Sequence, residues 1–128
     1  MIVEDAMRAD GAIVATPNEL AANVARRASE LNGRPVIVRA RVGEWRLMDA
    51  EELARLAADA PAAHKIGEGV SKGPLPIIFP DEPLEEVLRW VGDWAVLPVV
   101  SRADATKLEA VLTLEDILRA FRNTPGGV

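Results

Sequence analysis

The chain contains no cysteine and no tyrosine, and its only histidine is His64. Without cysteine it can form no disulfide bond and offers no thiol nucleophile, which is typical of proteins from a reducing compartment. His64 adjoins a glycine-rich stretch that we expect to be flexible, and the serines have no evident histidine partner in the sequence. We therefore predict that the chain has no catalytic residue and no metal site, and that it is not an enzyme.

The chain also lacks an excess of basic residues and a long apolar run. Its 20 acidic residues outnumber its 15 lysines and arginines, which gives a formal net charge of -5. Because binding to nucleic acid needs a concentrated basic face, we expect no nucleic-acid partner. No apolar run approaches the roughly 18 residues that span a bilayer, and no signal peptide is visible at the start. We expect a soluble, cytoplasmic segment that does not itself insert into a membrane.

What the sequence does contain is an internal repeat. Pro35-Val36-Ile37-Val38 is matched by Pro98-Val99-Val100, 63 residues later, and residues 48–53 are matched by residues 112–117, 64 residues later. The repeat predicts four segments, which are a first repeat at 1–64, a linker at 65–74, a second repeat at 75–122 and a tail at 123–128. Because repeats of about 60 residues are marginally stable alone, we expect the two to bury surface against each other and to enclose a cleft.

Each repeat shows the same order of expected elements. In the first repeat, apolar patterns and capping signals predict strands and helices in this order: strand 12–15, helix 18–31, strand 36–39, strand 45–48 and helix 50–60. In the second repeat, the corresponding elements are strand 75–79, a helix capped by Asp81, strand 95–100, strand 108–112 and helix 114–122 capped by Thr113. The sequence therefore predicts a mixed α+β fold with two βαββα repeats.

These residues resemble the tandem cystathionine-β-synthase-type domains, or CBS domains, which form the unit called a Bateman module. The resemblance covers about residues 3–122 and is strongest in Leu97-Pro98-Val99-Val100 and in Thr113-Leu114-Glu115-Asp116-Ile117-Leu118. It implies two βαββα repeats with pseudo-twofold symmetry, and a cleft that binds adenine nucleotides, adenosyl compounds or nothing. Members regulate an attached or neighbouring protein.

The second repeat looks most like the cytoplasmic tail of ClC-type chloride channels and transporters. Tails of magnesium transporters, free-standing modules and modules inserted into enzymes share the same elements. The resemblance therefore implies that the chain is a cytosolic part of a membrane transport protein, with a ClC-type channel or transporter as the expected host.

The expected ligand residues follow from the family pattern. In the family, an aspartate three residues after a serine or threonine at the start of the last helix binds the ribose hydroxyls, and Thr113 and Asp116 match that pattern. A carboxylate suits this role because it can accept hydrogen bonds from two vicinal hydroxyls. The same two residues are also a capping box that needs no ligand. In the first repeat Asp49 and Glu52 stand in these positions, and two carboxylates there would repel a phosphate.

The resemblance thus implies two unequal sites. The better site joins the first repeat to the second, and its residues are Ile13, Asn32, Gly33, Arg34, Thr113 and Asp116. Arg34 is placed to reach a phosphate, so ATP, ADP and AMP are the candidate ligands, while no cofactor is required. The poorer site, which we do not expect to be occupied, consists of Pro76, Ile77, Trp94, Asp49 and Glu52.

Trp90 and Trp94 lie four residues apart on a predicted helix, on a face offset from its apolar stripe. Family members commonly dimerise through such helices, and tryptophan is favoured at interface centres. We expect a homodimer with both tryptophans at or near its interface. Two functions remain open: a module that senses an adenine nucleotide for an attached ion channel or transporter, and a ligand-free structural module that dimerises its host.

Overall fold

The computed structural model describes residues 1–31, 34–58, 64–69 and 71–123. The chain forms two compact units. One unit is Ala12–Leu75, called the internal unit below, and the other combines Met1–Gly11 with Pro76–Val128 and is called the terminal unit. The segment boundaries that the internal repeat predicts, with repeats at 1–64 and 75–122, stay a prediction. The spatial units differ from them at the N-terminus, because the first eleven residues belong with the second repeat.

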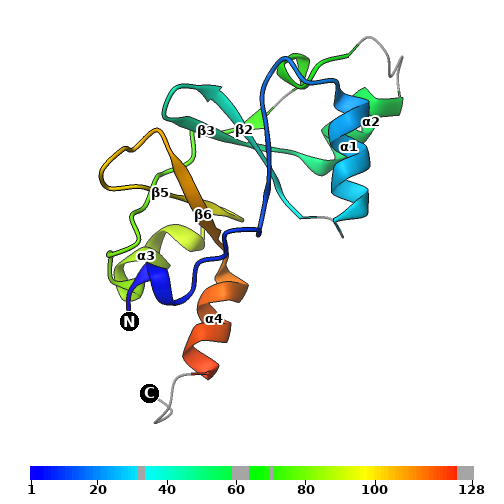
Figure 1. Ribbon diagram of the computed structural model, residues 1–128. Coiled ribbons are helices and arrows are strands. Elements are labelled where there is room, and N and C mark those ends of the chain that lie inside the picture. The colour runs from blue at the N-terminus through cyan, green and yellow to red at the C-terminus, as the bar shows by residue number, and fades with distance from the viewer. Residues whose placement is uncertain (32–33, 59–63, 70, 124–128) are drawn as a thin grey trace. The chain divides into compact units, whose positions relative to one another are not determined.

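The internal unit is a four-stranded sheet with two helices (Figure 1). Its elements are β1 (Ile13–Ala15), α1 (Ala21–Glu30), β2 (Val36–Arg41), β3 (Glu44–Met48), α2 (Ala50–Ala58) and β4 (Ser71–Lys72). The strands follow the order β1-β2-β3-β4, with β1 parallel to β2 and the other pairs antiparallel. A parallel pair needs a crossover connection, and α1 supplies the one between β1 and β2. Gly43, at φ 76°, makes the tight turn between β2 and β3.

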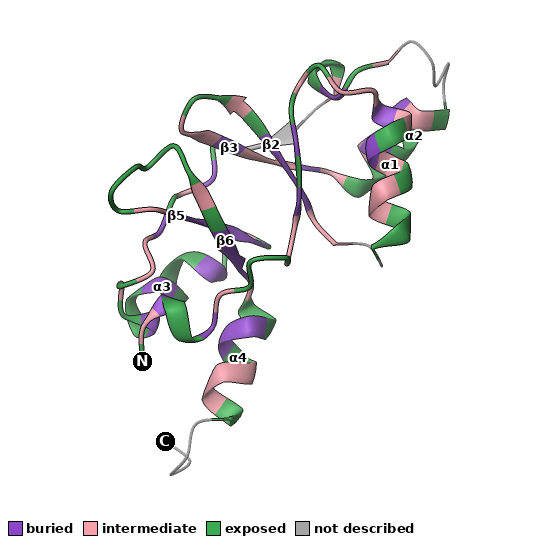
Figure 2. Ribbon diagram, viewed as in Figure 1, coloured by how far each residue is buried: buried purple, intermediate pink, exposed green. Residues whose placement is uncertain are grey.

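The core of the internal unit contains one face of the sheet and the inner faces of α1 and α2 (Figure 2). Its largest members are Ile13, Met48, Leu53, Leu56 and Ile66. Ile66 comes from the segment 65–74 that the sequence predicts to be a linker. This segment instead contributes a 3₁₀ turn, Ile66–Glu68, and strand β4, which pairs with β3. The turn Ile66–Glu68 and strand β4 therefore belong to the internal unit, and the linker boundaries at 65–74 stay a prediction.

Helix α1 begins later than the sequence predicts. The Glu19 carboxylate accepts a hydrogen bond from the Thr16 N–H at 2.7 Å, as the capping pattern indicates, but the helix begins at Ala21. The backbone between these points pairs with residues far along the chain. Ala21 N–H donates to the His64 carbonyl at 3.0 Å, and Ile66 N–H donates to the Glu19 carbonyl at 2.8 Å. These bonds hold residues 19–20 out of the helix.

The terminal unit pairs β5 (Leu97–Val100) with β6 (Leu108–Leu112) in antiparallel register. Helices α3 (Leu84–Val91) and α4 (Leu114–Arg122) contact each other beside this pair. The prediction of a strand at 75–79 is wrong in extent, because Ile78 alone bridges to Val99. Pro76 has no N–H to donate, and the Phe79 N–H donates to the Glu82 carboxylate at 3.2 Å, so the ladder cannot extend.

Asp81 does not cap α3, contrary to the sequence-based prediction. The residue at the N-cap of α3 is Pro83, and no side chain caps it. The Asp81 carboxylate instead accepts a hydrogen bond from the Arg102 guanidinium at 2.8 Å, and the same guanidinium lies 4.3 Å from the centroid of the Phe79 ring. The bond from Arg102 lowers the pKa of Asp81 below its ordinary value. Asp81 therefore anchors the β5–β6 loop rather than a helix.

The N-terminal segment is built into the terminal unit. Val3 N–H donates to the Glu82 carbonyl at 2.9 Å, and Arg8 exchanges backbone hydrogen bonds with Val111 at 2.9 and 3.0 Å. Val3 and Ala6 are buried in the same apolar cluster as Leu84, Val87, Leu97, Leu112 and Ile117. Residues 1–11 thus supply both backbone partners and core side chains to this unit.

Together the two units confirm the predicted mixed α+β class and the strand and helix order of its repeats. Each unit runs through an extended segment, a helix, two antiparallel strands and a second helix. In the part of the chain that the structure describes, no helix is both long enough and apolar enough to cross a membrane.

Candidate functional site

The candidate site begins at the first turn of α4. Thr113 is the N-cap residue, and its hydroxyl accepts a hydrogen bond from the Asp116 N–H at 3.2 Å. In return, the Thr113 N–H donates to Oδ2 of Asp116 at 3.0 Å. The predicted capping box is therefore confirmed. It satisfies two of the backbone donors that a helix start leaves open, and it fixes the Asp116 carboxylate against the helix end.

Among the residues that the structure describes, Asp116 is the one charged residue that is buried, at 4% exposure. Burying a carboxylate is costly unless it is paired and hydrogen-bonded. Oδ1 of Asp116 accepts from Nη1 of Arg119 at 3.2 Å and lies 3.9 Å from Nη1 of Arg8. Asp116 therefore joins α4 to the N-terminal segment, with two guanidinium groups compensating its charge.

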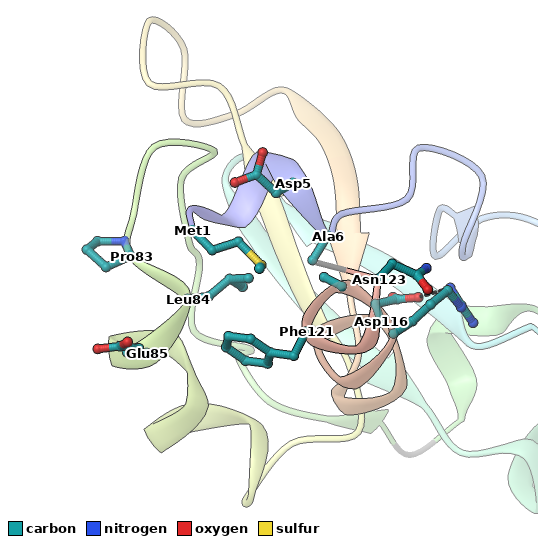
Figure 3. A pocket seen from close by; sticks show the side chains of 11 residues that line it. Met1, Asp5, Ala6, Pro83, Leu84, Glu85, Asp116, Phe121 and Asn123 are labelled. Atoms are coloured by element: carbon teal, nitrogen blue, oxygen red, sulfur yellow. Dashed lines mark hydrogen bonds and ion pairs between the residues drawn. The ribbon is translucent and has the colours of Figure 1, made fainter. Parts of the chain in front are cut away.

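Beside this carboxylate the terminal unit contains a pocket of about 880 Å³ (Figure 3). Its apolar lining includes Met1, Ala6, Pro83, Leu84, Ala120 and Phe121, and its polar lining is Asp5, Glu85, Asp116, Arg119 and Asn123. The side chains of Met1, Leu84 and Phe121 lie close to one another in Figure 3, while Asp116 and Asn123 lie on the other side of α4. A pocket of this size and mixed lining suits a small organic molecule.

The hydroxyl of Thr113 makes a testable contribution to stability. We expect Thr113→Ala to lower the free energy of unfolding of the terminal unit by about 1 kcal/mol, because the Asp116 N–H loses its acceptor. The measurement is the urea midpoint followed by circular dichroism. Thr113→Ser, which keeps the hydroxyl, is the control and should stay within about 0.5 kcal/mol of the parent chain. An unchanged midpoint for Thr113→Ala would show that the cap is not formed in solution.

The other residues of the better predicted site belong to the internal unit. Ile13 is buried in β1, and Arg34 is half-buried at the wall of a smaller, mainly apolar cavity of about 210 Å³ beside α1 and α2. Asn32 and Gly33 lie outside the described residues. The structure thus brings Thr113 and Asp116 together in one unit, and the joining of that pair to Ile13 and Arg34 stays a prediction.

In the first repeat, Asp49 and Glu52 stand in the positions of Thr113 and Asp116, and both form hydrogen bonds with nearby residues of α2. Oδ1 of Asp49 accepts from the N–H groups of Glu51 and Glu52 at 2.8 and 3.2 Å, so Asp49 caps α2 as predicted. The Glu52 carboxylate pairs with Arg55, with contacts at 2.6 and 3.1 Å. Pro76 and Ile77 belong to the terminal unit with Trp94, which is half-buried against its core.

Sequence reasoning missed the two arginines at Asp116. Arg119 could have been found, because it follows Asp116 by three residues on the helix, where side chains are neighbours. Arg8 carries no such signal, since its approach to Asp116 depends on the bridge between Arg8 and Val111. The roles of Phe121 and Glu85 in the pocket wall likewise arise from the packing of α3 and α4.

Trp90 is 49% exposed on α3, which confirms that it lies outside the core of its unit. The neighbouring helix α4 carries two further exposed apolar side chains, Leu114 at 46% and Leu118 at 50%. The role of Trp90 and Trp94 in a dimer interface stays a prediction.

Comparison with known proteins finds similarity in structure rather than in sequence. No protein-family model matches the sequence, and no curated protein matches it. Among solved structures, the CBS domain pair of protein MJ0100 in complex with 5′-methylthioadenosine and S-adenosyl-L-methionine matches with a TM-score of 0.71 and 20% identity. The match covers 95% of this chain and 96% of that chain.

Two other similar structures are longer than this chain. The cytosolic domain of the Mg²⁺ channel MgtE in complex with ATP matches with a TM-score of 0.66 and 19% identity, over 88% of this chain and 46% of that chain. The hexameric CBS-CP12 protein from bloom-forming cyanobacteria matches with a TM-score of 0.69 and 18% identity, over 92% of this chain and 66% of that chain. The chain therefore has the fold of a tandem CBS domain pair.

Proposed function

We propose that the chain is a cytoplasmic regulatory module that binds an adenosine-containing ligand and transmits its occupancy to an attached or neighbouring protein. The observation that carries this proposal is the buried carboxylate of Asp116, held at the start of α4 on the wall of a pocket of about 880 Å³. The likeness in fold to pairs solved with ATP and with adenosyl compounds supports the same ligand class.

Asp116 has the acceptor capacity that a ribose requires. A carboxylate offers about four lone-pair sites, and the hydrogen bonds from Thr113 N–H and Arg119 occupy two of them. The remaining sites can accept from the two vicinal ribose hydroxyls. Because the carboxylate is already fixed by the capping box, little side-chain entropy is lost when the ligand binds. The bound ligand shifts the population of the protein toward the conformation that binds it more tightly. The free energy of this shift cannot exceed the difference between the ligand's binding free energies for the two conformations.

The host protein in this proposal is a membrane channel or transporter, and the expected type is the ClC type. The match to the cytosolic domain of a Mg²⁺ channel supports a channel or transporter host in general, while the ClC type rests on the sequence resemblance in residues 97–118. The module is proposed to be a homodimer and to catalyse no reaction of its own.

Calorimetric titration tests the ligand class. We expect at least one of ATP, ADP, AMP, 5′-methylthioadenosine and S-adenosylmethionine to bind, and Asp116→Asn to weaken that binding at least about tenfold through loss of a charge-assisted acceptor. Glu115→Gln is the matched control, because Glu115 is the exposed neighbour on α4 that also contacts Arg119, at 3.4 Å. Equal losses in the two variants would mean that Asp116 does not contact the ligand, and no binding by any compound would refute the proposal.

A second candidate function is a ligand-free module that dimerises its host. The observation in its favour is that backbone and arginine groups of the chain itself compensate the Asp116 carboxylate. Exposed Trp90, Leu114 and Leu118 also favour an association surface. A dimer with no heat of binding and no change in melting temperature with any adenosine compound would select this function over the first.

A further inference from the structure

The N-terminal segment, residues 1–11, forms one wall of the pocket of the terminal unit. The residues that line the pocket from this segment are Met1, Asp5 and Ala6. The start of α3 and one face of α4 form the other walls. In Figure 3, Met1 lies beside Leu84 of α3 and Phe121 of α4, so side chains from all three elements meet in the pocket. The pocket is therefore complete only while the N-terminal segment stays docked on the unit.

The same segment supplies a positive charge to the buried carboxylate of Asp116. Nη1 of Arg8 lies 3.9 Å from Oδ1 of Asp116. The backbone of Arg8 is fixed at this position by its two hydrogen bonds with Val111, at 2.9 and 3.0 Å. Because a buried carboxylate is costly unless it is paired, undocking of the segment removes a compensating charge from Asp116. The environment of Asp116 and the docking of the segment are thus linked.

The N-terminal segment is held by a short set of contacts. The N–H groups of Val3 and Glu4 donate to the carbonyls of Glu82 and Pro80, both at 2.9 Å. Val3 is fully buried, and Ala6 is buried in the same apolar cluster. A segment held in this way opens at a lower free energy than the whole unit does. Its opening exposes Val3 and Ala6 and the part of the core that they cover.

From these contacts we infer that the N-terminal segment transmits occupancy of the pocket: a bound ligand holds residues 1–11 docked, with Arg8 on Asp116, and loss of the ligand lets them open. The inference rests on the proposed function and names the regulation of that site. By linkage, the ligand stabilises the docked segment by the same free energy by which docking strengthens the ligand's binding. The opened segment presents Val3 and Ala6 as an apolar surface to the attached or neighbouring protein.

Hydrogen exchange of the Val3 and Glu4 amides measures the docking directly. The probes are ATP, AMP, 5′-methylthioadenosine and S-adenosylmethionine, and each one that binds is added to the full chain at about 100 times its dissociation constant. We expect exchange of both amides to slow at least about tenfold, because ligand at this concentration disfavours an opening that destroys its site by up to about 100-fold. The Ser101 amide, which donates to the Lys107 carbonyl in the β5–β6 loop, is the internal reference and should change by less than about twofold.

Arg8→Gln tests the ion pair between the segment and Asp116. We expect it to speed exchange of the Val3 and Glu4 amides by about threefold to fivefold in the absence of ligand, as suits a partly exposed pair. Arg89→Gln is the matched control, because Arg89 is exposed on α3 of the same unit and the substitution removes the same charge. It should change these rates by less than about twofold. Equal effects of the two variants would overturn the role of Arg8.

The ligand experiment separates this inference from the proposed function. A compound that binds but leaves exchange of Val3 and Glu4 unchanged would overturn the inference and leave the proposed function intact. Equal slowing at Ser101 would overturn it as well, because the ligand would then stabilise the unit as a whole. Absence of binding by every compound would refute the proposed function together with this inference.

Discussion

Ile117→Ala should lower the free energy of unfolding of the terminal unit by about 2–5 kcal/mol, one of the two largest effects that we expect from a single substitution. The side chain of Ile117 is fully buried, in a cluster that joins α3, α4, the β5–β6 pair and the N-terminal segment. The substitution removes three buried carbon atoms, so their transfer free energy is lost. It also leaves a cavity among α3, α4, the β5–β6 pair and the N-terminal segment. The measurement is hydrogen exchange of the β5 and β6 amides, which reports the opening of this unit separately from the internal unit.

The adjacent residue supplies the control for this experiment. Leu118 is 50% exposed on the same helix, so Leu118→Ala should change the free energy of unfolding by less than about 0.5 kcal/mol. Should Ile117→Ala fail to fold, Ile117→Val still provides the test, with an expected loss of about 0.5–1.5 kcal/mol. Equal effects at positions 117 and 118 would contradict the packing of α4 against the terminal unit.

Trp90→Glu should raise the dissociation constant of the proposed homodimer by at least about 30-fold. A tryptophan at an interface centre contributes roughly 2 kcal/mol or more, and the substitution also places a carboxylate in an apolar contact. Trp90 is 49% exposed on α3, so the parent unit leaves it accessible to a partner. Analytical ultracentrifugation over a range of concentrations gives the dissociation constant.

Val42→Glu is the matched control for the dimer experiment. Val42 is 83% exposed in the β2–β3 turn of the internal unit, and its substitution introduces the same charge while leaving the residues of α3 and α4 unchanged. It should leave sedimentation unchanged. A parent chain that is monomeric at tens of micromolar would refute the homodimer, and a Trp90→Glu variant that still dimerises as the parent does would place the interface on another surface.

The parts of the fold that depend on neighbouring residues could be predicted from the sequence. The strands around Val36 and Val99 were identified because branched apolar side chains continue through them, and the start of α4 because Thr113 and Asp116 satisfy each other's backbone groups. Asp49 caps α2 for the same reason. In each case the hydrogen bonds that form the element join residues a few positions apart or residues of adjacent strands. A short stretch of sequence is therefore enough to predict the element.

The parts that could not be predicted depend on residues far apart in the sequence. The start of α1 is delayed by backbone bonds to residues 64–66, and the segment 75–79 gains one bridge to β5 rather than a full ladder. The candidate site shows the same division. The capping box was predicted, whereas Arg8 reaches Asp116 only because its segment pairs with Val111 more than a hundred residues later.

The docking of residues 1–11 on the terminal unit also determines the order in which the chain can fold during synthesis. The internal unit lies wholly within Ala12–Leu75, so it can close once that segment has left the ribosome. Val3 and Ala6 must wait for Val87, Leu112 and Ile117 before they are buried. Through that interval Val3 and Ala6 stay exposed, while the segment Ala12–Leu75 that follows them is already folded.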